Sequence, residues 1–387
     1  MPRVAPFVGL RYDAAVVGPL GPLTAPPYDV ISEPHRARFA AASPYNAVHL
    51  DLGSGADDDD RYAGAATLLA SWETTGVLRP DPQPMYYVYE VRWPTTDDVD
   101  AGLFAGVFVA LTLEPWGGAV LPHEETMPGP IEDRLRLLRA TRTHLSPIYG
   151  TIRGPHPPLA ELLSGVTDDA PAEEVIDEEG VQHRLWLVPG DEPIASWLAD
   201  DELLIADGHH RYTTALAYRD ERHAIDGPGP WDTILALVVD TGTQEVPVLP
   251  YHRVQMAGSP AAPDRAVDGL EELRRVLSDT ELRVGVITRG DDALAYGALQ
   301  LAGPPPAVRA LHDAVLDDLA PGDALRFTHS AADAEDAVRD GAVAAYLLPP
   351  TTPDRVLTAI ERGQRLPRKS TFFWPKPRTG LLFMPVR

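Results

Sequence analysis

The segment Asp-Gly-His-His-Arg at 207–211 combines residue types that bind phosphate. The apolar run 203–206 before it predicts a buried strand, and the apolar spacing of 209–222 after it predicts a helix. The segment is therefore expected at a helix N-terminus, where unpaired backbone N–H groups and the helix dipole favour an anion. Gly208 permits close approach of the backbone, and the guanidinium of Arg211 can bind phosphate oxygens through charge-assisted hydrogen bonds. We predict a phosphate site here.

The other side chains of this segment have alternative roles. The carboxylate of Asp207 can hold a phosphate-bound metal ion or accept a proton from a reacting group. We group His209 with the phosphate-binding residues and expect His210 to assist proton transfer. The structural alternative is that Asp207 only caps the helix while both histidines lie at the surface. Two adjacent histidines followed by an arginine, directly after an apolar strand, favour the functional interpretation.

Two polar groups lie in proline-rich loops nearer the N-terminus. Tyr28 and Asp29 follow two prolines, which favour extended backbone and predict a fixed loop that presents both side chains to substrate. A packing strand at the domain edge is an equal alternative. His123, Glu124 and Thr126 lie in a proline-bounded loop ahead of a predicted helix, and we interpret them as substrate contacts, with Glu124 also a candidate proton acceptor.

The C-terminal segment differs in charge from the rest of the chain. From 364 to 387 there are six basic residues and no acidic one, and the only two lysines of the protein, Lys369 and Lys376, both lie there. In a chain of net charge −24, such a segment is a candidate anion contact, so we predict that Lys369, Ser370 and Lys376 bind phosphate. The alternative is a basic tail that neutralises an acidic body.

Composition limits the class of protein. Length of 387 residues suggests two or three domains, and 44% hydrophobic residues suffice for a real core. A net charge of −24 disfavours nucleic acid and anionic membranes as partners. The absence of cysteine excludes disulfides and thiol chemistry. No apolar run is long enough for a membrane span and no signal-peptide core is present, so we expect a cytoplasmic protein.

Familiar nucleotide-binding motifs are absent. Because lysine occurs only at 369 and 376, a Walker loop and the protein-kinase constellation are both impossible. No G-x-G-x-x-G follows a predicted strand. A nucleotide would have to be bound through a different motif.

The periodicity of the chain predicts a mixed α/β fold. Strands are expected at 46–52, 85–93, 102–113 and 233–240, and an amphipathic helix at 265–278. The predicted divisions are an N-terminal mixed α/β region (1–150), a linker or surface excursion (151–182), a core with the phosphate-binding turn (183–255), an α/β lobe (256–362) and a basic segment that returns to the site (363–387).

Five motifs occur in order: Ala-Pro-Pro-Tyr-Asp-Val-Ile-Ser (25–32), His-Glu-x-Thr (123–126), Glu-Asp-Arg-Leu (132–135), Ala-Asp-Gly-His-His-Arg-Tyr (206–212) and Lys-Ser-Thr-Phe-Phe (369–373). Together they resemble the prokaryotic family known as domain of unknown function 1015. The resemblance implies that Asp133 and Arg134 contact substrate. That family commonly has a lysine just before the third motif, whereas this chain has Ile131, so we expect no phosphate contact from that position.

The turn at 207–211 is also similar to the phosphate-binding turn of the ParB/sulfiredoxin-like superfamily, in which a Gly-x-x-Arg segment holds nucleotide phosphates. That superfamily includes free-serine kinases, CTP-binding segregation proteins and ATP-using sulfinic acid reductases. The resemblance implies a ParB/sulfiredoxin-like nucleotide-binding core with an additional C-terminal α/β lobe.

The first functional hypothesis is a small-molecule kinase that resembles the free-serine kinases. It would use ATP or ADP with Mg²⁺, bind phosphate at the turn, and neutralise developing charge with Lys369. Glu124 and Asp207 are alternative proton acceptors, and Asp207 is the expected metal ligand.

Two other classes of function remain open. The chain can be a nucleotide-binding switch or partner-binding protein without metabolite phosphorylation, although its charge argues against DNA binding. A metal-dependent hydrolase built on His123, Glu124, His209 and His210 has suitable ligands but no recognised spacing.

Overall fold

The structure of the protein is a computed structural model that describes residues 3–55, 58–96, 99–124, 128–290, 293–317 and 324–387. The chain divides into two compact units. Unit 1 consists of Met1–Pro122, Thr126–Glu245 and Pro375–Arg387, and unit 2 consists of His123–Glu125 and Val246–Trp374.

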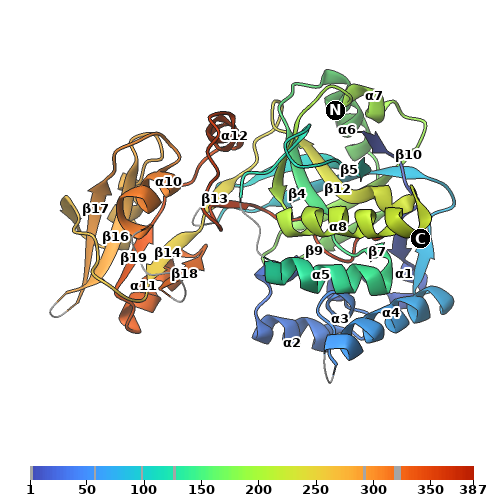
Figure 1. The fold of residues 1–387 in the computed structure, drawn as a ribbon, viewed down its shortest axis with the longest axis horizontal. Helices are drawn as coiled ribbons and strands as arrows, with labels where there is room; N and C mark the ends of the chain where they lie inside the picture. Colours follow the sequence, from blue (N-terminus) through green and yellow to red (C-terminus); the bar gives the residue numbers. More distant parts are fainter. Residues whose placement is uncertain (1–2, 56–57, 97–98, 125–127, 291–292, 318–323) are drawn as a thin grey trace. The chain divides into compact units, whose positions relative to one another are not determined.

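A mixed β-sheet forms the centre of unit 1 (Figure 1). Its strands run in the order β6-β11-β8-β12-β5-β4-β10-β9, with β1 paired to β5. Their bounds are β1 (Val4–Ala5), β4 (Met85–Trp93), β5 (Gly102–Thr112), β6 (Val120–Leu121), β8 (Ile148–Ile152), β9 (Glu173–Ile176), β10 (Gln182–Pro189), β11 (Leu203–Asp207) and β12 (Thr233–Asp240). β8 lies between β11 and β12, antiparallel to the first and parallel to the second. The sheet therefore places the end of β11 beside the start of β8.

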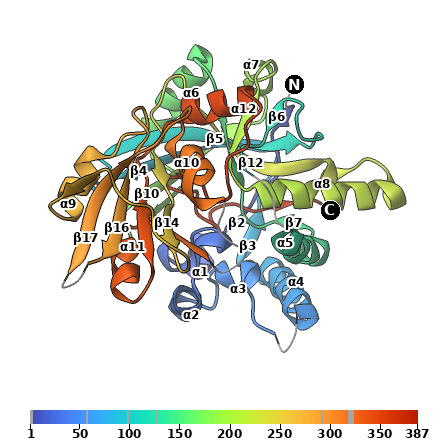
Figure 2. The ribbon, with the colours of Figure 1, turned by 60° about the vertical axis from the view of Figure 1, so that its left-hand side comes forward.

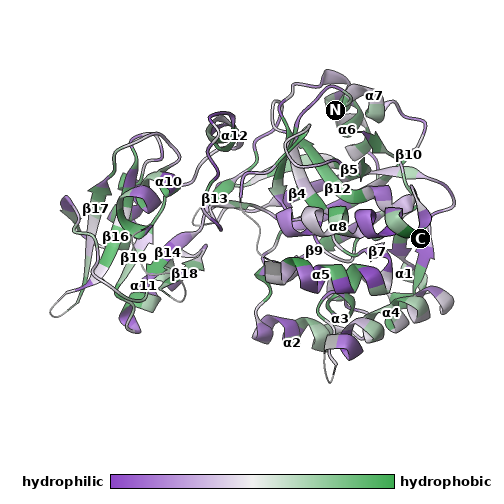
Figure 3. Ribbon diagram, viewed as in Figure 1, coloured by the Kyte–Doolittle hydropathy of each residue, from purple (hydrophilic) through white to green (hydrophobic). Residues whose placement is uncertain are grey.

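The hydrophobic core explains why these segments form strands. Alternate residues of β5, including Val107 and Val109, join residues of β8, β11 and β12 in one buried cluster. Leu159 and Leu163 of α6, Ile194 of α7 and Tyr212 of α8 pack into the same cluster. Figure 3 shows hydrophobic residues along β12 and a mixture of hydrophobic and hydrophilic residues along α8. This pattern is that of strands buried in a core and of a helix with one buried face.

The helices of unit 1 form layers beside the sheet. Both Figure 1 and Figure 2 show α8, α5 and α4 in succession, with α8 nearest the sheet. The helices are α1 (Ala14–Val17), α2 (Glu33–Ala42), α3 (Val48–Asp51), α4 (Asp58–Thr74), α5 (Pro128–Thr141), α6 (Pro157–Thr167), α7 (Ile194–Trp197), α8 (His209–Asp226) and the 3₁₀ turns η1 (Gly21–Leu23), η2 (Tyr28–Val30) and η3 (Pro230–Asp232). The range 151–182 thus carries α6 and β9.

The predicted basic segment 363–387 is divided between the units, and only Pro375–Arg387 is part of unit 1. Its strand β21 (Met384–Pro385) pairs with β7 (Thr143–His144), and a second small pair joins β2 (Leu10–Tyr12) to β3 (Leu78–Pro80). The backbone N–H of Arg378 donates to the hydroxyl of Tyr89 at 3.2 Å. These contacts fix the position of Lys376, which precedes Arg378 by two residues.

Unit 2 has its own sheet, in the order β15-β17-β16-β19-β14-β18. One hydrophobic cluster joins the sheet to α10, and another joins it to α9 and α11, so helices cover both faces. A separate pair joins β13 and β20. The elements are β13 (Val248–Pro250), β14 (His252–Gln255), β15 (Arg265–Val267), α9 (Leu270–Val276), β16 (Arg283–Arg289), β17 (Leu294–Gln300), α10 (Ala307–Leu311), the π-helical turn η4 (His312–Leu316), β18 (Leu325–Thr328), α11 (Ala331–Arg339), β19 (Ala344–Leu347), α12 (Pro353–Glu361) and β20 (Thr371–Phe373).

The predicted mixed α/β fold class is confirmed, but two predicted elements are wrong. The strand expected at 46–52 is the short helix α3, because Oδ1 of Asn46 accepts the N–H of Val48 at 2.9 Å and turns the backbone. The helix expected at 265–278 is divided into β15 and α9 by Gly269, which adopts φ 94°. Within the part of the chain that the structure describes, no helix has the length and hydrophobicity needed to span a bilayer.

Candidate functional site

The turn between β11 and α8 has the predicted strand–turn–helix geometry. β11 ends at Asp207, Gly208 is the N-cap with φ 98°, and α8 begins at His209. A Cβ atom on Gly208 would lie 2.9 Å from Cγ2 of Ile148. Glycine is required here on two grounds, because the backbone is left-handed and the neighbouring strand approaches closely.

The carboxylate of Asp207 lies between two buried cations. Nζ of Lys376 is 2.5 Å from its Oδ1, and Nη2 of Arg211 donates to its Oδ2. Lys376 also lies 3.3 Å from Oδ2 of Asp29. Nη1 of Arg211 donates to the carbonyl of Pro147. Burial lowers the pKa of Arg211, but the negative charges of Asp207 and Asp29 raise it by more, so the net pKa is raised and the guanidinium stays charged. Two cations and two carboxylates therefore meet at the start of α8.

A second group of charges surrounds Arg134, which α5 carries. Nη1 of Arg134 lies 2.7 Å from Oδ1 of Asp51, and its Nε lies 2.7 Å from Oδ2 of Asp133. The guanidinium stacks on the ring of Tyr28 at 4.1 Å from the centroid. Burial, followed by the charge of Asp29, raises the pKa of Tyr28 well above its usual value, so its phenol stays neutral.

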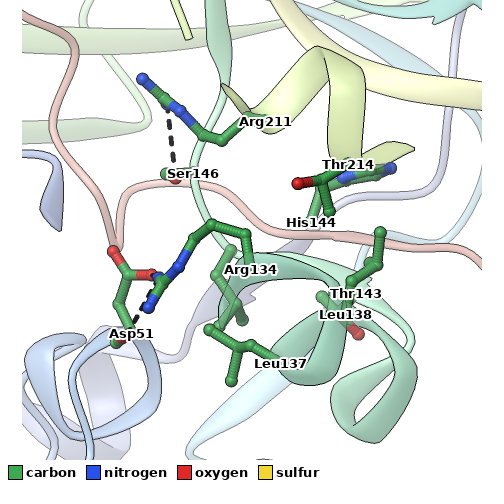
Figure 4. A pocket seen from close by; sticks show the side chains of 10 residues that line it. Asp51, Arg134, Leu137, Leu138, Thr143, His144, Ser146, Arg211 and Thr214 are labelled. Atoms are coloured by element: carbon green, nitrogen blue, oxygen red, sulfur yellow. Dashed lines mark hydrogen bonds and ion pairs between the residues drawn. The ribbon is translucent and has the colours of Figure 1, made fainter. Parts of the chain in front are cut away.

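A pocket of about 40 Å³ lies between the two groups (Figure 4). Its lining residues are Asp51, Arg134, Leu137, Leu138, Thr143, His144, Leu145, Ser146, Arg211 and Thr214. Oδ2 of Asp51 is buried and has no hydrogen-bond partner within the described part of the chain. Burial lowers the pKa of His144 to about 4, so this imidazole is neutral near pH 7.

The predicted residues of unit 2 form a separate polar cluster. Glu124 accepts hydrogen bonds from the backbone N–H groups of Lys369 at 3.2 Å, Ser370 at 2.9 Å and Thr371 at 3.3 Å. Nε2 of His123 lies 2.6 Å from the hydroxyl of Thr371. Lys369 adopts φ 54°, and its ammonium lies 5.1 Å from the ring centroid of Tyr251. In this arrangement the Glu124 carboxylate holds the turn that carries Lys369.

The structure thus divides the predicted site residues into two sets. Unit 1 contains Tyr28, Asp29, Asp133, Arg134, Asp207, Gly208, His209, His210, Arg211 and Lys376. Unit 2 contains His123, Glu124, Lys369 and Ser370, while Thr126 lies outside the described residues. The ring of His209 stacks on Trp116 at 6.1 Å between centroids.

Sequence reasoning missed five polar residues of the pocket: Asp51, Thr143, His144, Ser146 and Thr214. Asp51 fell within the segment that was wrongly predicted as a strand. No motif or charge cluster marks the other four. Thr214 lies on α8 three residues after Arg211. The other three precede β8, and their proximity to Arg211 arises from the pairing of β8 with β11, which sequence spacing does not encode.

The donor set of unit 1 fits a nucleotide phosphate, because two cations and a helix N-terminus meet at Asp207. No group of three or more His, Asp or Glu side chains is arranged to hold a metal ion among the described residues. Mg²⁺ bound with a nucleotide commonly takes one or two carboxylates, with phosphate oxygens and water completing its shell. Both oxygens of Asp207 contact cations in this structure, so Asp207 could supply such a carboxylate only by exchanging one of them.

The sequence profile of one family, described as Protein of unknown function (DUF1015), matches residues 4–312. The chain belongs to this family. No curated protein sequence matches the chain. Similar solved structures include a free serine kinase in complex with AMP, at 14% identity over 76% of this chain and 96% of that chain, with a TM-score of 0.37.

A mutant free serine kinase in complex with ADP is 12% identical over 76% of this DUF1015 chain and 96% of its own, with a TM-score of 0.36. A conserved hypothetical protein from Pyrococcus furiosus is 14% identical over 70% of this chain and 93% of its own, with a TM-score of 0.34. These values are too low to transfer an activity.

Proposed function

We propose that the protein is a small-molecule kinase of the cytoplasm. It would move a phosphoryl group from ATP or ADP to a hydroxyl acceptor, and free L-serine is the first acceptor to test. The observation that carries the proposal is the position of Asp207 at the N-terminus of α8, held by Arg211 and Lys376.

Phosphoryl transfer depends on positioning the phosphates and on neutralising their charge. A nucleotide phosphate at the start of α8 would accept hydrogen bonds from the backbone N–H groups next to Gly208. Arg211 and Lys376 would then leave the carboxylate of Asp207 and bind phosphate oxygens. This exchange is possible because a carboxylate and a phosphate both form charge-assisted hydrogen bonds with these cations.

The exchange would leave Asp207 beside the bound phosphates. Mg²⁺, when bound there, supplies charge neutralisation across the phosphate oxygens. Asp207 would hold the ion with one oxygen, while His210 lies one residue past the start of the helix and can assist proton transfer. The residues of unit 1 are sufficient for this part of the proposal.

A phosphorus-31 NMR time course tests the proposal. The full chain is mixed with Mg²⁺, L-serine and either ADP or ATP, and a phosphomonoester signal that grows only when serine is present is the expected result. Nucleotide resonances that shift without turnover would favour a nucleotide-binding switch instead. Unperturbed resonances for both nucleotides would refute the phosphate site.

The variant Asp207→Asn separates binding from turnover. We expect it to bind nucleotide and to lose turnover. Asp81→Asn is a matched control, because Asp81 is also buried and paired with an arginine, Arg11, at 2.7 Å, and does not line the pocket. Equal turnover in both variants would contradict a role for Asp207.

A further inference from the structure

The carboxylates of the candidate sites differ in how they are partnered. Both oxygens of Asp207 are held by cations, and Glu124 accepts hydrogen bonds from three backbone N–H groups within unit 2. Oδ1 of Asp51 accepts a hydrogen bond from Arg134 at 2.7 Å, but Oδ2 of Asp51 has no partner among the residues that the structure describes, although Asp51 is only 5% exposed. A buried acceptor that makes no hydrogen bond costs about 1–3 kcal/mol, and such groups are rare in folded proteins. The unsatisfied oxygen therefore points to a hydrogen-bond donor supplied by a ligand.

The pocket at Asp51 has room for a small polar group. Its volume of about 40 Å³ corresponds to roughly three ordered water molecules. Leu137 and Leu138 supply apolar walls, while Ser146 and Thr214 supply hydroxyls (Figure 4). Arg211 lines the same pocket and also contacts Asp207, so the pocket adjoins the proposed phosphate site. A ligand group that donates a hydrogen bond to Asp51 and a phosphate bound to Arg211 would thus lie side by side.

We propose that this pocket receives the hydroxyl-bearing end of the phosphoryl acceptor and that Asp51 is the catalytic residue that accepts its proton. This inference rests on the proposed kinase function. The acceptor oxygen forms a bond to the terminal phosphorus of the nucleotide as the bond from that phosphorus to the bridging oxygen breaks. The nucleotide leaves with the electron pair of the broken bond, as ADP from ATP or AMP from ADP. The hydroxyl proton moves to Oδ2 of Asp51.

The surroundings of Asp51 suit this role. Burial raises the pKa of the Asp51 carboxyl above its ordinary value, although Arg134 and Arg211 lower it. A carboxylate with a raised pKa is a stronger base than an exposed aspartate. The ion pair to Arg134 holds Oδ1, while Oδ2 makes no hydrogen bond to the described residues.

The test compares Asp51→Asn with wild type in the phosphorus-31 assay, with L-serine as acceptor and ADP or ATP as donor. We expect kcat to fall by about 100-fold or more, which is typical for loss of a general base, with nucleotide Kd unchanged. The acidic limb of the wild-type pH profile is expected to disappear in the variant. Asp81→Asn is the control for the loss of a buried carboxylate paired with arginine.

A second variant keeps the test decisive if Asp51→Asn does not fold. Ser146→Val removes a polar group and fills part of the pocket, so we expect a higher KM for the acceptor. A kcat within threefold of wild type in Asp51→Asn, or an unchanged acceptor KM in Ser146→Val, overturns the inference while the kinase function stands. A wild-type protein that produces no phosphomonoester overturns the kinase function itself, and this step with it.

Discussion

Nζ of Lys376 lies 2.5 Å from Oδ1 of Asp207, although 169 residues separate them in the chain. Both side chains are largely buried, with 6% and 14% of their surface exposed. A buried ion pair contributes little net stability, because desolvation of both charges offsets their attraction, but the loss of one partner is strongly destabilising. We therefore interpret the pair as part of the proposed phosphate site.

Replacing Lys376 by Met should weaken nucleotide binding. The variant loses one of two cations at the start of α8, so we expect the Kd of ADP to rise at least tenfold, which corresponds to about 1.4 kcal/mol. Isothermal titration calorimetry measures this change. Arg92→Met removes an exposed cation of the same unit and should leave the Kd unaltered. An equal Kd for both variants would show that Lys376 does not contact the nucleotide.

Gly208→Ala should lower both stability and nucleotide affinity. Gly227 provides a matched control, because it ends the same helix with φ 75° and a Cβ there would meet no atom within 4 Å. Both variants pay the strain of a left-handed alanine, about 1 kcal/mol, but only Gly208→Ala adds a clash with Ile148. We expect a lower Tm and weaker ADP binding for Gly208→Ala than for Gly227→Ala. Indistinguishable variants would refute the close approach at the turn.

His144 should make the stability of unit 1 depend on pH. Its pKa is about 4 in the folded chain and near 6.5 when unfolded, so the unfolded state binds more protons between these values. Stability is therefore lost as the pH falls from about 6.5 towards 4. Between pH 7 and pH 5 we expect His144→Gln to lose about 2 kcal/mol less than wild type.

Urea unfolding followed by tryptophan fluorescence measures this difference. Every tryptophan except Trp374 belongs to unit 1, so the signal reports mainly on that unit. The low pKa values of His252 and His312 in unit 2 affect both proteins equally. Parallel losses of stability in wild type and variant would contradict a neutral, buried His144.

Glu124→Ala should loosen the turn that carries Lys369. The variant leaves the N–H groups of Lys369, Ser370 and Thr371 without their acceptor. At about 1–3 kcal/mol for each unmade bond, hydrogen exchange at 369–371 should accelerate by at least tenfold, as mass spectrometry would detect. Glu271→Ala, on the exposed surface of α9, is the control. Unchanged exchange at 369–371 would mean that Glu124 does not hold the turn.

Local sequence patterns were sufficient to predict the turn at 207–211. An apolar run, an Asp-Gly pair and a helical repeat each depend on neighbouring residues, and β11, Gly208 and α8 follow them closely. The strands expected at 85–93 and 233–240 agree with β4 and β12 for the same reason. Buried strands of this length leave a strong local signal.

The pocket could not be predicted, because it depends on contacts between distant segments. Asp51 meets Arg134 across 83 residues, and neither spacing nor composition records that contact. The error at 46–52 had a local cause, since one hydrogen bond that the side chain of Asn46 accepts from the N–H of Val48 converts an alternating pattern into a helical turn. The rarity of lysine was the one long-range signal, because only two of the many basic residues are lysines and Lys376 is one of them.

The C-terminal segment Pro375–Arg387 belongs to unit 1, although all of Val246–Trp374 comes before it in unit 2. A ribosome adds about 5–20 residues each second, so unit 1 waits on the order of ten seconds for this segment. During that interval Asp207 and Arg211 have been synthesised, but Lys376 has not. The candidate phosphate site is therefore complete only after unit 2 has been synthesised, and a chain that stops before Lys376 lacks one of the two cations of the site.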